Sequence, residues 1–200
     1  MAESAQAPEM QRTFIALDLP MAIQQGLAAW ALTAFTEPAL RTVRPEALHV
    51  TLSFLGASDP GRVKRLVAVV DALAVEPVRL AFRPELTARP RRKPRVFAVE
   101  VDSESLTGLR ARLQADLVAS GVTEPDEGRF WPHVTVARVR SSAGSRTKGG
   151  PLPVLKAPGT LPAALLDPFD GVRVALYRSD LRPRGAEYVP LARKHLPPTA

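Results

Sequence analysis

Two short stretches of this sequence place a histidine and a threonine two residues apart and alternate them with apolar residues: His49 and Thr51, then His133 and Thr135. Successive side chains of a β-strand point to opposite faces. Each stretch therefore predicts a strand with an apolar, core-facing side and a side that carries an imidazole and a hydroxyl. The chain holds only three histidines, and two of them lie in this setting. One such pair is common and usually without function, but two matching copies indicate a shared site.

A pair of histidines that face each other across a cleft can carry out acid–base chemistry. Histidine titrates near neutrality, so one ring can accept a proton from an attacking water while the other donates one to a departing oxygen. Neighbouring hydroxyl groups can hydrogen-bond an anionic oxygen. Together these groups supply what hydrolysis of a phosphodiester requires. The sequence offers no further ligands at zinc-binding spacing and no H-E-x-x-H motif, so we expect neither a metal nor another cofactor.

Arg138 lies five residues after His133 and could hold a phosphate as a cation. In a regular strand it would lie on the same face as Val134 and Val136, so its side chain would point away from His133. It reaches the site only if the strand ends or bulges before it. A structural salt bridge and a role in substrate binding are therefore both open for this residue.

Four aromatic residues, Phe14, Phe130, Trp131 and Tyr188, are candidates to stack on a nucleobase, although aromatic side chains more often belong to the core. The segment Arg89–Arg95 holds five cations and two prolines, which predicts an irregular loop. Such a loop can contact an RNA backbone or simply be solvated. His195, among basic residues near the terminus, is expected to lie on the surface.

The composition narrows the class of protein. Two hundred residues, 46% of them apolar, suit one domain or two small, closely packed lobes. No apolar run approaches the roughly 20 residues of a membrane span, and residues 1–11 lack a signal peptide's apolar core, so we expect a short disordered leader there. The absence of cysteine excludes disulfides and fits a cytoplasmic location. The net charge of +7 favours a polyanionic partner such as nucleic acid.

The elements around the motifs follow one order twice: strand, helix, strand, helix, strand. This repetition predicts an internal duplication, with two α+β lobes that face each other across a cleft. The expected strands are 12–19, 48–55, 78–83, 96–101, 133–140, 171–177 and 188–191, and the expected helices are 20–35, 60–74 and 103–120.

Local signals add detail to this outline. Asp59 and Ser103 are expected to cap the second and third helices, and Gly56 to end the first motif strand. Residues 141–168 are expected to form a loop with one helical turn near 161–166, residues 180–186 a turn, and the chain after His195 a loose tail. The apolar face of the first motif strand is expected to be core: Leu48, Val50, Leu52 and Phe54.

These residues resemble the 2H phosphoesterase superfamily, which is named for two H-x-[ST]-x motifs. The resemblance is closest to its RNA 2',3'-cyclic phosphodiesterase branch, also described as 2'-5' RNA ligase-like. It spans residues 12–196, interpreted as a single domain, and four stretches carry it: Arg12–Ala16, Leu48–Gly56, Phe130–Arg138, and the closing pair Leu176–Leu181 with Gly185–Tyr188.

The resemblance implies a bilobal α+β fold of mainly antiparallel sheet, with the two motifs facing across the cleft. It implies metal-independent hydrolysis of RNA 2',3'-cyclic phosphate ends to 2'-phosphomonoesters, with 2'-5' ligation as a further activity of some members. By analogy, His49 would protonate the departing 3' oxygen, His133 would activate water, and Thr51 and Thr135 would hold the phosphate. The near-symmetry of the motifs gives no independent way to choose acid from base.

Two other functions stay open. One keeps the site but takes another cyclic nucleotide as its substrate. The other is an RNA-binding module that has kept the fold without catalysis, although binding alone does not require two titratable histidines. The partner expected from the resemblance is RNA ending in a 2',3'-cyclic phosphate, bound by a monomer away from membranes.

Overall fold

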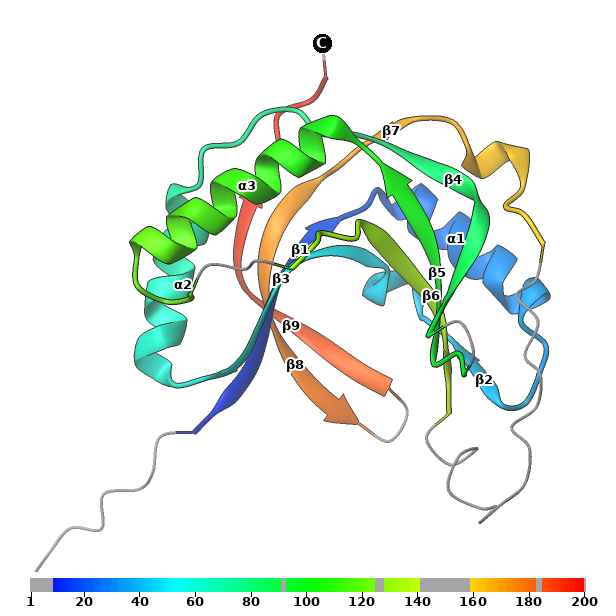
Figure 1. The fold of residues 1–200 in the computed structure, drawn as a ribbon, viewed down its shortest axis with the longest axis horizontal. Helices are drawn as coiled ribbons and strands as arrows, with labels where there is room; N and C mark the ends of the chain where they lie inside the picture. Colours follow the sequence, from blue (N-terminus) through cyan, green and yellow to red (C-terminus); the bar gives the residue numbers. More distant parts are fainter. Residues whose placement is uncertain (1–8, 91–92, 125–127, 141–158, 183–184, 200) are drawn as a thin grey trace, which may run out of the picture.

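The computed structural model describes residues 9–90, 93–124, 128–140, 159–182 and 185–199 (Figure 1). In these residues the strands form one nine-stranded sheet of order β7-β4-β5-β6-β3-β1-β8-β9, with β2 beside β6, and all pairings are antiparallel. The strands are β1 Gln11–Asp18, β2 Leu40–Thr42, β3 His49–Ser58, β4 Arg79–Arg89, β5 Val96–Asp102, β6 His133–Val139, β7 Phe169–Asp170, β8 Arg173–Arg182 and β9 Gly185–His195. The helices are α1 Met21–Ala34, α2 Pro60–Ala72 and α3 Glu104–Ala119, with short 3-10 turns η1 Pro45–Ala47 and η3 Ala163–Leu165.

The two motif strands lie side by side at the centre of the sheet. β3 pairs with β6 through Val50 and Val134, and on the outer sides β1 pairs with β3 as β5 pairs with β6. The arrangement is therefore approximately twofold about this central pair. The predicted α+β class with two related lobes is confirmed, and the lobes share one curved sheet (Figure 1).

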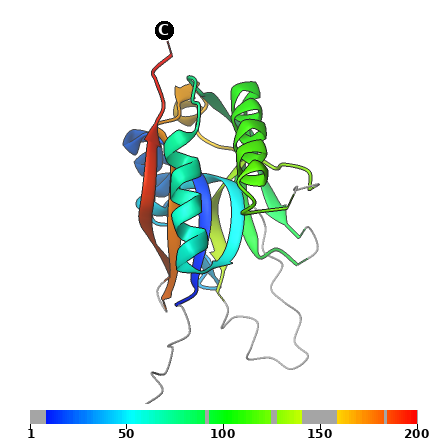
Figure 2. The same cartoon turned by 90° about the vertical axis from the view of Figure 1, so that its left-hand side faces the viewer.

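The helices cover the sheet and close one continuous core. α2 and α3 run side by side in both views, with α2 packed on β8 and β9 and α3 beside β4, while α1 packs on β2 and β6 (Figures 1 and 2). Both predicted caps are confirmed: the Asp59 side chain accepts from the Arg62 N–H, and Ser103 accepts from the Leu106 N–H. These contacts fix where each helix begins and so how it sits on the strands that carry the motifs.

Several boundaries differ from those expected. β3 continues through Gly56 to Ser58, because Gly56 adopts a positive φ of 69° that a glycine tolerates inside a strand. β8 and β9 extend to Arg182 and from Gly185, so the turn predicted over 180–186 was wrong, and the strand expected at 188–191 is confirmed but is part of a longer one. Pairing of the two strands extends the ladder through polar residues whose own strand preference is weak.

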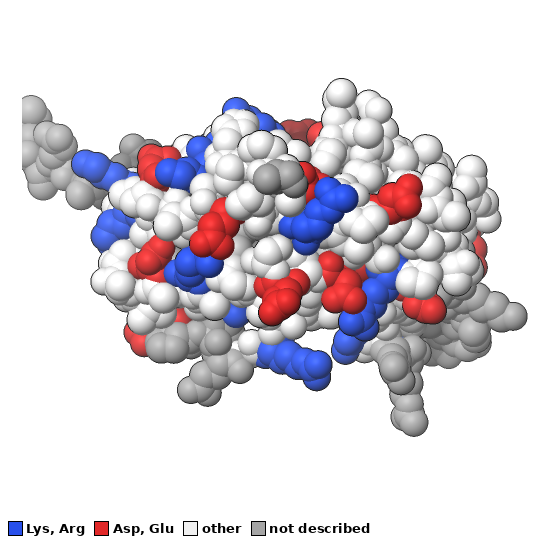
Figure 3. Space-filling view, turned by 90° about the horizontal axis from the view of Figure 1, so that it is seen from above, with Lys and Arg blue, Asp and Glu red and all other residues white. Residues whose placement is uncertain are grey.

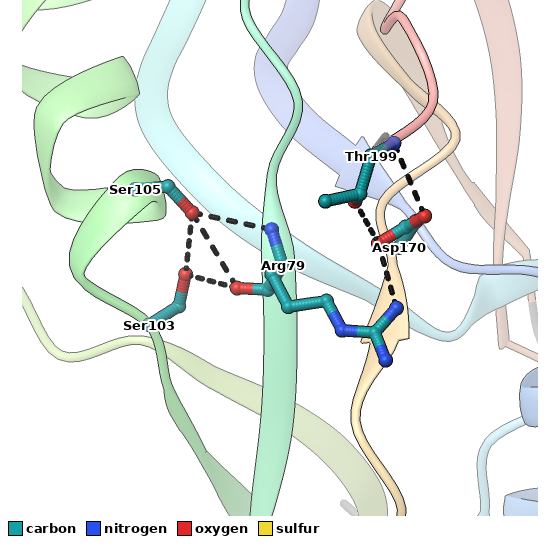
Figure 4. A network of polar contacts seen from close by, with 5 residues as sticks. All are labelled: Arg79, Ser103, Ser105, Asp170 and Thr199. Carbon is teal, nitrogen blue, oxygen red and sulfur yellow. Dashed lines mark hydrogen bonds and ion pairs between the residues drawn. The ribbon is translucent and has the colours of Figure 1, made fainter.

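The segment after His195 is anchored, contrary to the loose tail expected. The Leu196 N–H bonds the Val172 carbonyl, and Thr199 donates to the Asp170 carboxylate. Asp170 also pairs with Arg79 at 3.0 Å, and the Arg79 carbonyl accepts from Ser103 (Figure 4). This network ties the C-terminal segment to β4, β7 and the start of α3.

Two expected irregular regions fall largely outside the described residues. Residues 1–8 of the expected 1–11 leader are not described, and Gln11 already belongs to β1, opposite Ser58. Residues 141–158 of the predicted loop are not described either, whereas the helical turn expected near 161–166 is confirmed as η3. Within the part of the chain that is described, no helix has the length and apolar character needed to cross a membrane.

Candidate active site

The four motif side chains come together on one face of the central strands. The antiparallel register at Val50 and Val134 sets His49 beside Thr135 and His133 beside Thr51, while the two valines are fully buried on the other face. All four polar residues line one cleft of about 760 Å³. The structure thus places the sequence-predicted residues together.

Matching bulges follow the two motifs. The register between β3 and β1 skips Leu52, and the register between β6 and β5 skips Val136, each three residues after a motif histidine. The first six residues of both strands share one pattern of burial, in which positions four and five are both buried and position six is exposed. An extra residue in a strand moves the side chains that follow it to the opposite face of the sheet. Phe54 and Arg138 consequently turn onto the face of the histidines.

These bulges determine the positions of two residues, one that the sequence analysis placed wrongly and one whose role it left open. Phe54, expected in the core, is 79% exposed and lines the cleft, and Leu55 is buried in its place. Arg138 could reach the site only if the strand bulged before it, and β6 does bulge there, at Val136. It lines the cleft, and its charge acts on both His49 and His133.

Backbone carbonyls orient the two imidazole rings in the same way. The His133 Nδ1 lies 2.7 Å from the carbonyl oxygen of Trp131, so Nδ1–H donates and Nε2 stays free. The backbone of Ala47 accepts a hydrogen bond from the His49 ring, since this bond raises the pKa of His49. In both motifs the acceptor is the second residue before the histidine. This repeated bond fixes the ring tautomer, which determines the nitrogen available for proton transfer.

Aromatic side chains pack against both rings. Trp131 stacks on His133 with centroids 3.7 Å apart, and Phe14 stacks on His49 at 5.0 Å. Tyr188 meets the His49 ring edge-on at 5.3 Å and lines the cleft, as does Phe14. Of the four candidate base-stacking residues, Phe14 and Tyr188 line the cleft, whereas Phe130 and Trp131 are not among the described residues that line it.

A carboxylate lies behind each stack: Asp18 is buried and Glu100 is half-buried. Asp18 is opposite His49 in the β1–β3 register, and Glu100 is opposite His133 in the β5–β6 register. Glu100 accepts from the Trp131 indole N–H at 3.0 Å. Asp18 accepts from Arg173 at 2.6 Å and from the Tyr177 hydroxyl at 2.8 Å, and Tyr177 stacks on Phe14. Each carboxylate therefore steadies the aromatic group that positions a histidine ring.

Burial and nearby cations keep both histidines neutral in the free protein. Burial lowers the pKa of His49 to about 4, against the hydrogen bond to Ala47, and the charges of Arg138 and His133 add to the lowering. Burial also lowers the pKa of His133, and Arg138 and Arg89 act in the same direction. At neutral pH each ring thus has one nitrogen that can accept a proton, which in His133 is Nε2. An anion bound near Arg138 would offset the cation and raise both pKa values.

The lowered pKa of His49 predicts a loss of stability in mild acid. Between the ordinary value of 6.5 and about 4, the unfolded chain binds a proton that the folded site excludes. Above pH 6.5 the neutral ring makes its full contribution to the free energy of unfolding. As the pH falls from 6.5 toward 4, this contribution is lost, and the free energy of unfolding decreases by about 3 kcal/mol at most. Chemical denaturation above and below this window should show a larger loss in the wild type than in His49→Gln. An equal loss in both would contradict the assignment.

The basic segment 89–95 contributes one residue to the site's surroundings. Arg89 belongs to β4, and its guanidinium lies over the Trp131 ring, 4.7 Å from the centroid. Arg91 and Arg92 lie outside the described residues.

His195 is exposed at the end of β9, as expected. Among the residues that the structure describes, no three or more histidine or acidic side chains form a group that could hold a metal ion.

Four further arginines line the cleft that sequence reasoning did not find: Arg12, Arg41, Arg44 and Arg182. No aspartate or glutamate is among the described residues that line it. By contrast, the face seen in Figure 3 carries acidic and basic side chains interspersed. The cleft is therefore suited to an anionic ligand. Its arginines come from β1, β2, β8 and the turn before β3, so only the tertiary fold brings them together.

Comparison with known proteins agrees with the fold. The family model described as the 2'-5' RNA ligase superfamily matches residues 19–147. An RNA 2',3'-cyclic phosphodiesterase of Bacillus subtilis is 30% identical over 131 residues, which cover 62% of this chain and 69% of that protein. The chain belongs to the 2'-5' RNA ligase superfamily.

Members of this superfamily match the chain over nearly its whole length. An RNA 2',3'-cyclic phosphodiesterase of Methanothermobacter thermautotrophicus is 29% identical over 88% of this chain and 94% of its own length. The apo form of E. coli LigT superposes with a TM-score of 0.69 at 26% identity, covering 94% of this chain and 98% of LigT. The resemblance and the fold expected from the sequence are both confirmed.

Proposed function

We propose that this protein hydrolyses RNA 2',3'-cyclic phosphate ends to 2'-phosphomonoesters by two-histidine acid–base catalysis. The observation that carries the proposal is the convergence of His49, Thr51, His133 and Thr135 from equivalent strands on one cleft free of described carboxylates. The names of the relatives above support the same activity.

In the proposed reaction His133 acts as the base. Its Nδ1–H is held by the Trp131 carbonyl, so Nε2 can take a proton from water as the water oxygen bonds to phosphorus. The bond from phosphorus to the 3' oxygen breaks, and His49 donates a proton to that oxygen. The phosphate stays on the 2' oxygen. The assignment of His49 as donor follows the family analogy and requires that the bound anion raise its pKa from about 4.

The remaining groups would stabilise charge on the phosphate. Thr51 and Thr135 lie beside the opposite histidines, where their hydroxyls can donate to the non-bridging oxygens. Arg138 lies on the same face and supplies a positive charge. Because the site excludes part of the solvent, as the lowered pKa values of His49 and His133 indicate, these interactions are stronger than they would be in water.

The test is a single-product assay. The purified full chain is incubated in EDTA with a short RNA that ends in a 2',3'-cyclic phosphate, and the position of the product phosphate is determined by phosphorus NMR. We expect a 2'-phosphate at an undiminished rate in EDTA. A 3'-phosphate product, or activity that depends on added metal, would contradict the proposed mechanism.

The same displacement accounts for ligation as an additional activity. A 5'-hydroxyl in place of water would attack the cyclic phosphate, expel the same 3' oxygen and leave a 2'-5' phosphodiester. Adding an RNA with a 5'-hydroxyl to the assay tests this reaction. A protein that only binds RNA would give neither product, and one specific for another cyclic nucleotide would turn over that compound faster.

A further inference from the structure

Two arginines lie directly opposite each other on the floor of the cleft. Arg41 in β2 pairs in register with Arg138 in β6, so their side chains share a face, and both line the cleft. Like charges directly opposite on neighbouring strands destabilise a sheet. In the part of the chain that the structure describes, neither guanidinium has an ion pair or a hydrogen bond, whereas Arg44 pairs with Glu46 and Arg182 with Glu187.

Arg41 also reaches the opposite wall of the cleft. Its side chain is half-buried, and its guanidinium packs against Gly185 at the start of β9. A Cβ added to Gly185 would lie 3.4 Å from Nη1 and 3.5 Å from Cζ of Arg41. The guanidinium therefore spans the space from β2 to the β8–β9 hairpin. This contact does not neutralise its charge, and the described residues supply no ion pair to it.

The arginine pair lies farther from the twofold centre than the histidines. Arg138 is five residues beyond His133 along β6, and Arg41 is on the next strand outward. Arg41 therefore lies on a strand outside the pair that carries His49, His133 and Arg138, and an anion bound at Arg41 is distinct from the one proposed to be held between the histidines. The cleft of about 760 Å³ is large enough for more than the reacting group.

We propose that Arg41, next to Arg138, forms a second phosphate-binding subsite that takes the phosphate on the 5' side of the terminal nucleotide. This inference rests on the proposed function and specifies its substrate class: the protein acts on RNA chain ends in preference to cyclic mononucleotides. A neighbouring phosphodiester at Arg41, with the reacting phosphate at Arg138, would relieve the repulsion between the two guanidinium groups.

Three substrates separate the contributions. Adenosine 2',3'-cyclic phosphate has no phosphate on its 5' side. Its 5'-phosphorylated form adds that phosphate but no second nucleoside. The dinucleotide ApA with a 2',3'-cyclic end has both the phosphate and the second nucleoside. In Arg41→Ala we expect kcat/KM to fall about tenfold on the last two, the effect of one charge-assisted hydrogen bond, and to stay unchanged on the first. Arg41→Lys should restore part of the loss.

The control variant is Lys64→Ala, which removes one exposed positive charge from α2, away from the cleft. It should leave all three rates unchanged. A loss in Arg41→Ala confined to the dinucleotide would assign Arg41 to the second nucleoside, and an equal loss on all three would assign it to the reacting centre; either result overturns the subsite. So does an Arg41→Ala variant with no loss on any substrate.

Failure of the proposed function gives a different result. If the wild type turns over none of the three substrates, calorimetric binding of the same compounds still tests the subsite. Affinity that depends on the 5'-phosphate and on Arg41 would support the subsite without the reaction. Equal affinity with and without the 5'-phosphate would overturn it.

Discussion

Replacing His49 or His133 by alanine should each lower kcat about 10²- to 10⁴-fold on an RNA with a 2',3'-cyclic end, because each variant loses one proton transfer. The double variant should be little worse than either single one, since the two groups act in the same step. Rates are measured under single-turnover conditions. His195→Ala is the matched control: it removes the third histidine, exposed at the end of β9, and should keep full activity.

The pH profiles of the variants test which histidine is the acid. If His133 is the base, His133→Ala loses the acidic limb of the residual profile, and if His49 is the donor, His49→Ala loses the alkaline limb. An exchange of the two limbs would reverse the assignment. Near-wild-type rates in both variants, with unchanged melting temperatures, would exclude the two-histidine mechanism.

Replacing Arg138 by glutamine should lower kcat/KM about 10²- to 10³-fold, the usual cost of removing one preorganised donor to a developing anion. The same change should raise the pKa of His49 and of His133, because the Arg138 charge disfavours the protonated form of both rings. The acidic limb of the kcat/KM profile would then move to higher pH. NMR titration of the imidazole protons gives the two pKa values directly.

Arg138→Lys separates the charge from the shape of the guanidinium. It should keep the lowered histidine pKa values while recovering only part of the activity, since an ammonium cannot donate two parallel hydrogen bonds. Unchanged pKa values in Arg138→Gln would show that Arg138 does not act on the rings. A full recovery by lysine would show that charge alone is required.

Much of the fold followed from local pattern. The alternation around His49 and His133, the caps at Asp59 and Ser103 and the apolar stripes of the helices each depend on residues close in sequence. The repeated order of elements predicted two related lobes. The long β8–β9 hairpin was underestimated because its tip residues acquire strand structure only from each other.

The residues missed in the site depend on pairing between distant strands. Phe54 was assigned to the core because the bulge at Leu52 arises from the register with β1, which the sequence of β3 does not reveal. Arg41 belongs to a three-residue strand whose partner is β6, so its position opposite Arg138 has no local signal.

The matching bulges have a consequence for the direction in which an RNA strand can bind. A perfectly twofold site would accept a cyclic phosphate in two orientations and let the histidines exchange roles. The bulges place non-identical side chains at equivalent positions, an exposed aromatic ring in Phe54 and a cation in Arg138. One end of the cleft therefore favours a base and the other a phosphate. In the proposed reaction, this difference would give the substrate a single orientation and each histidine one fixed role.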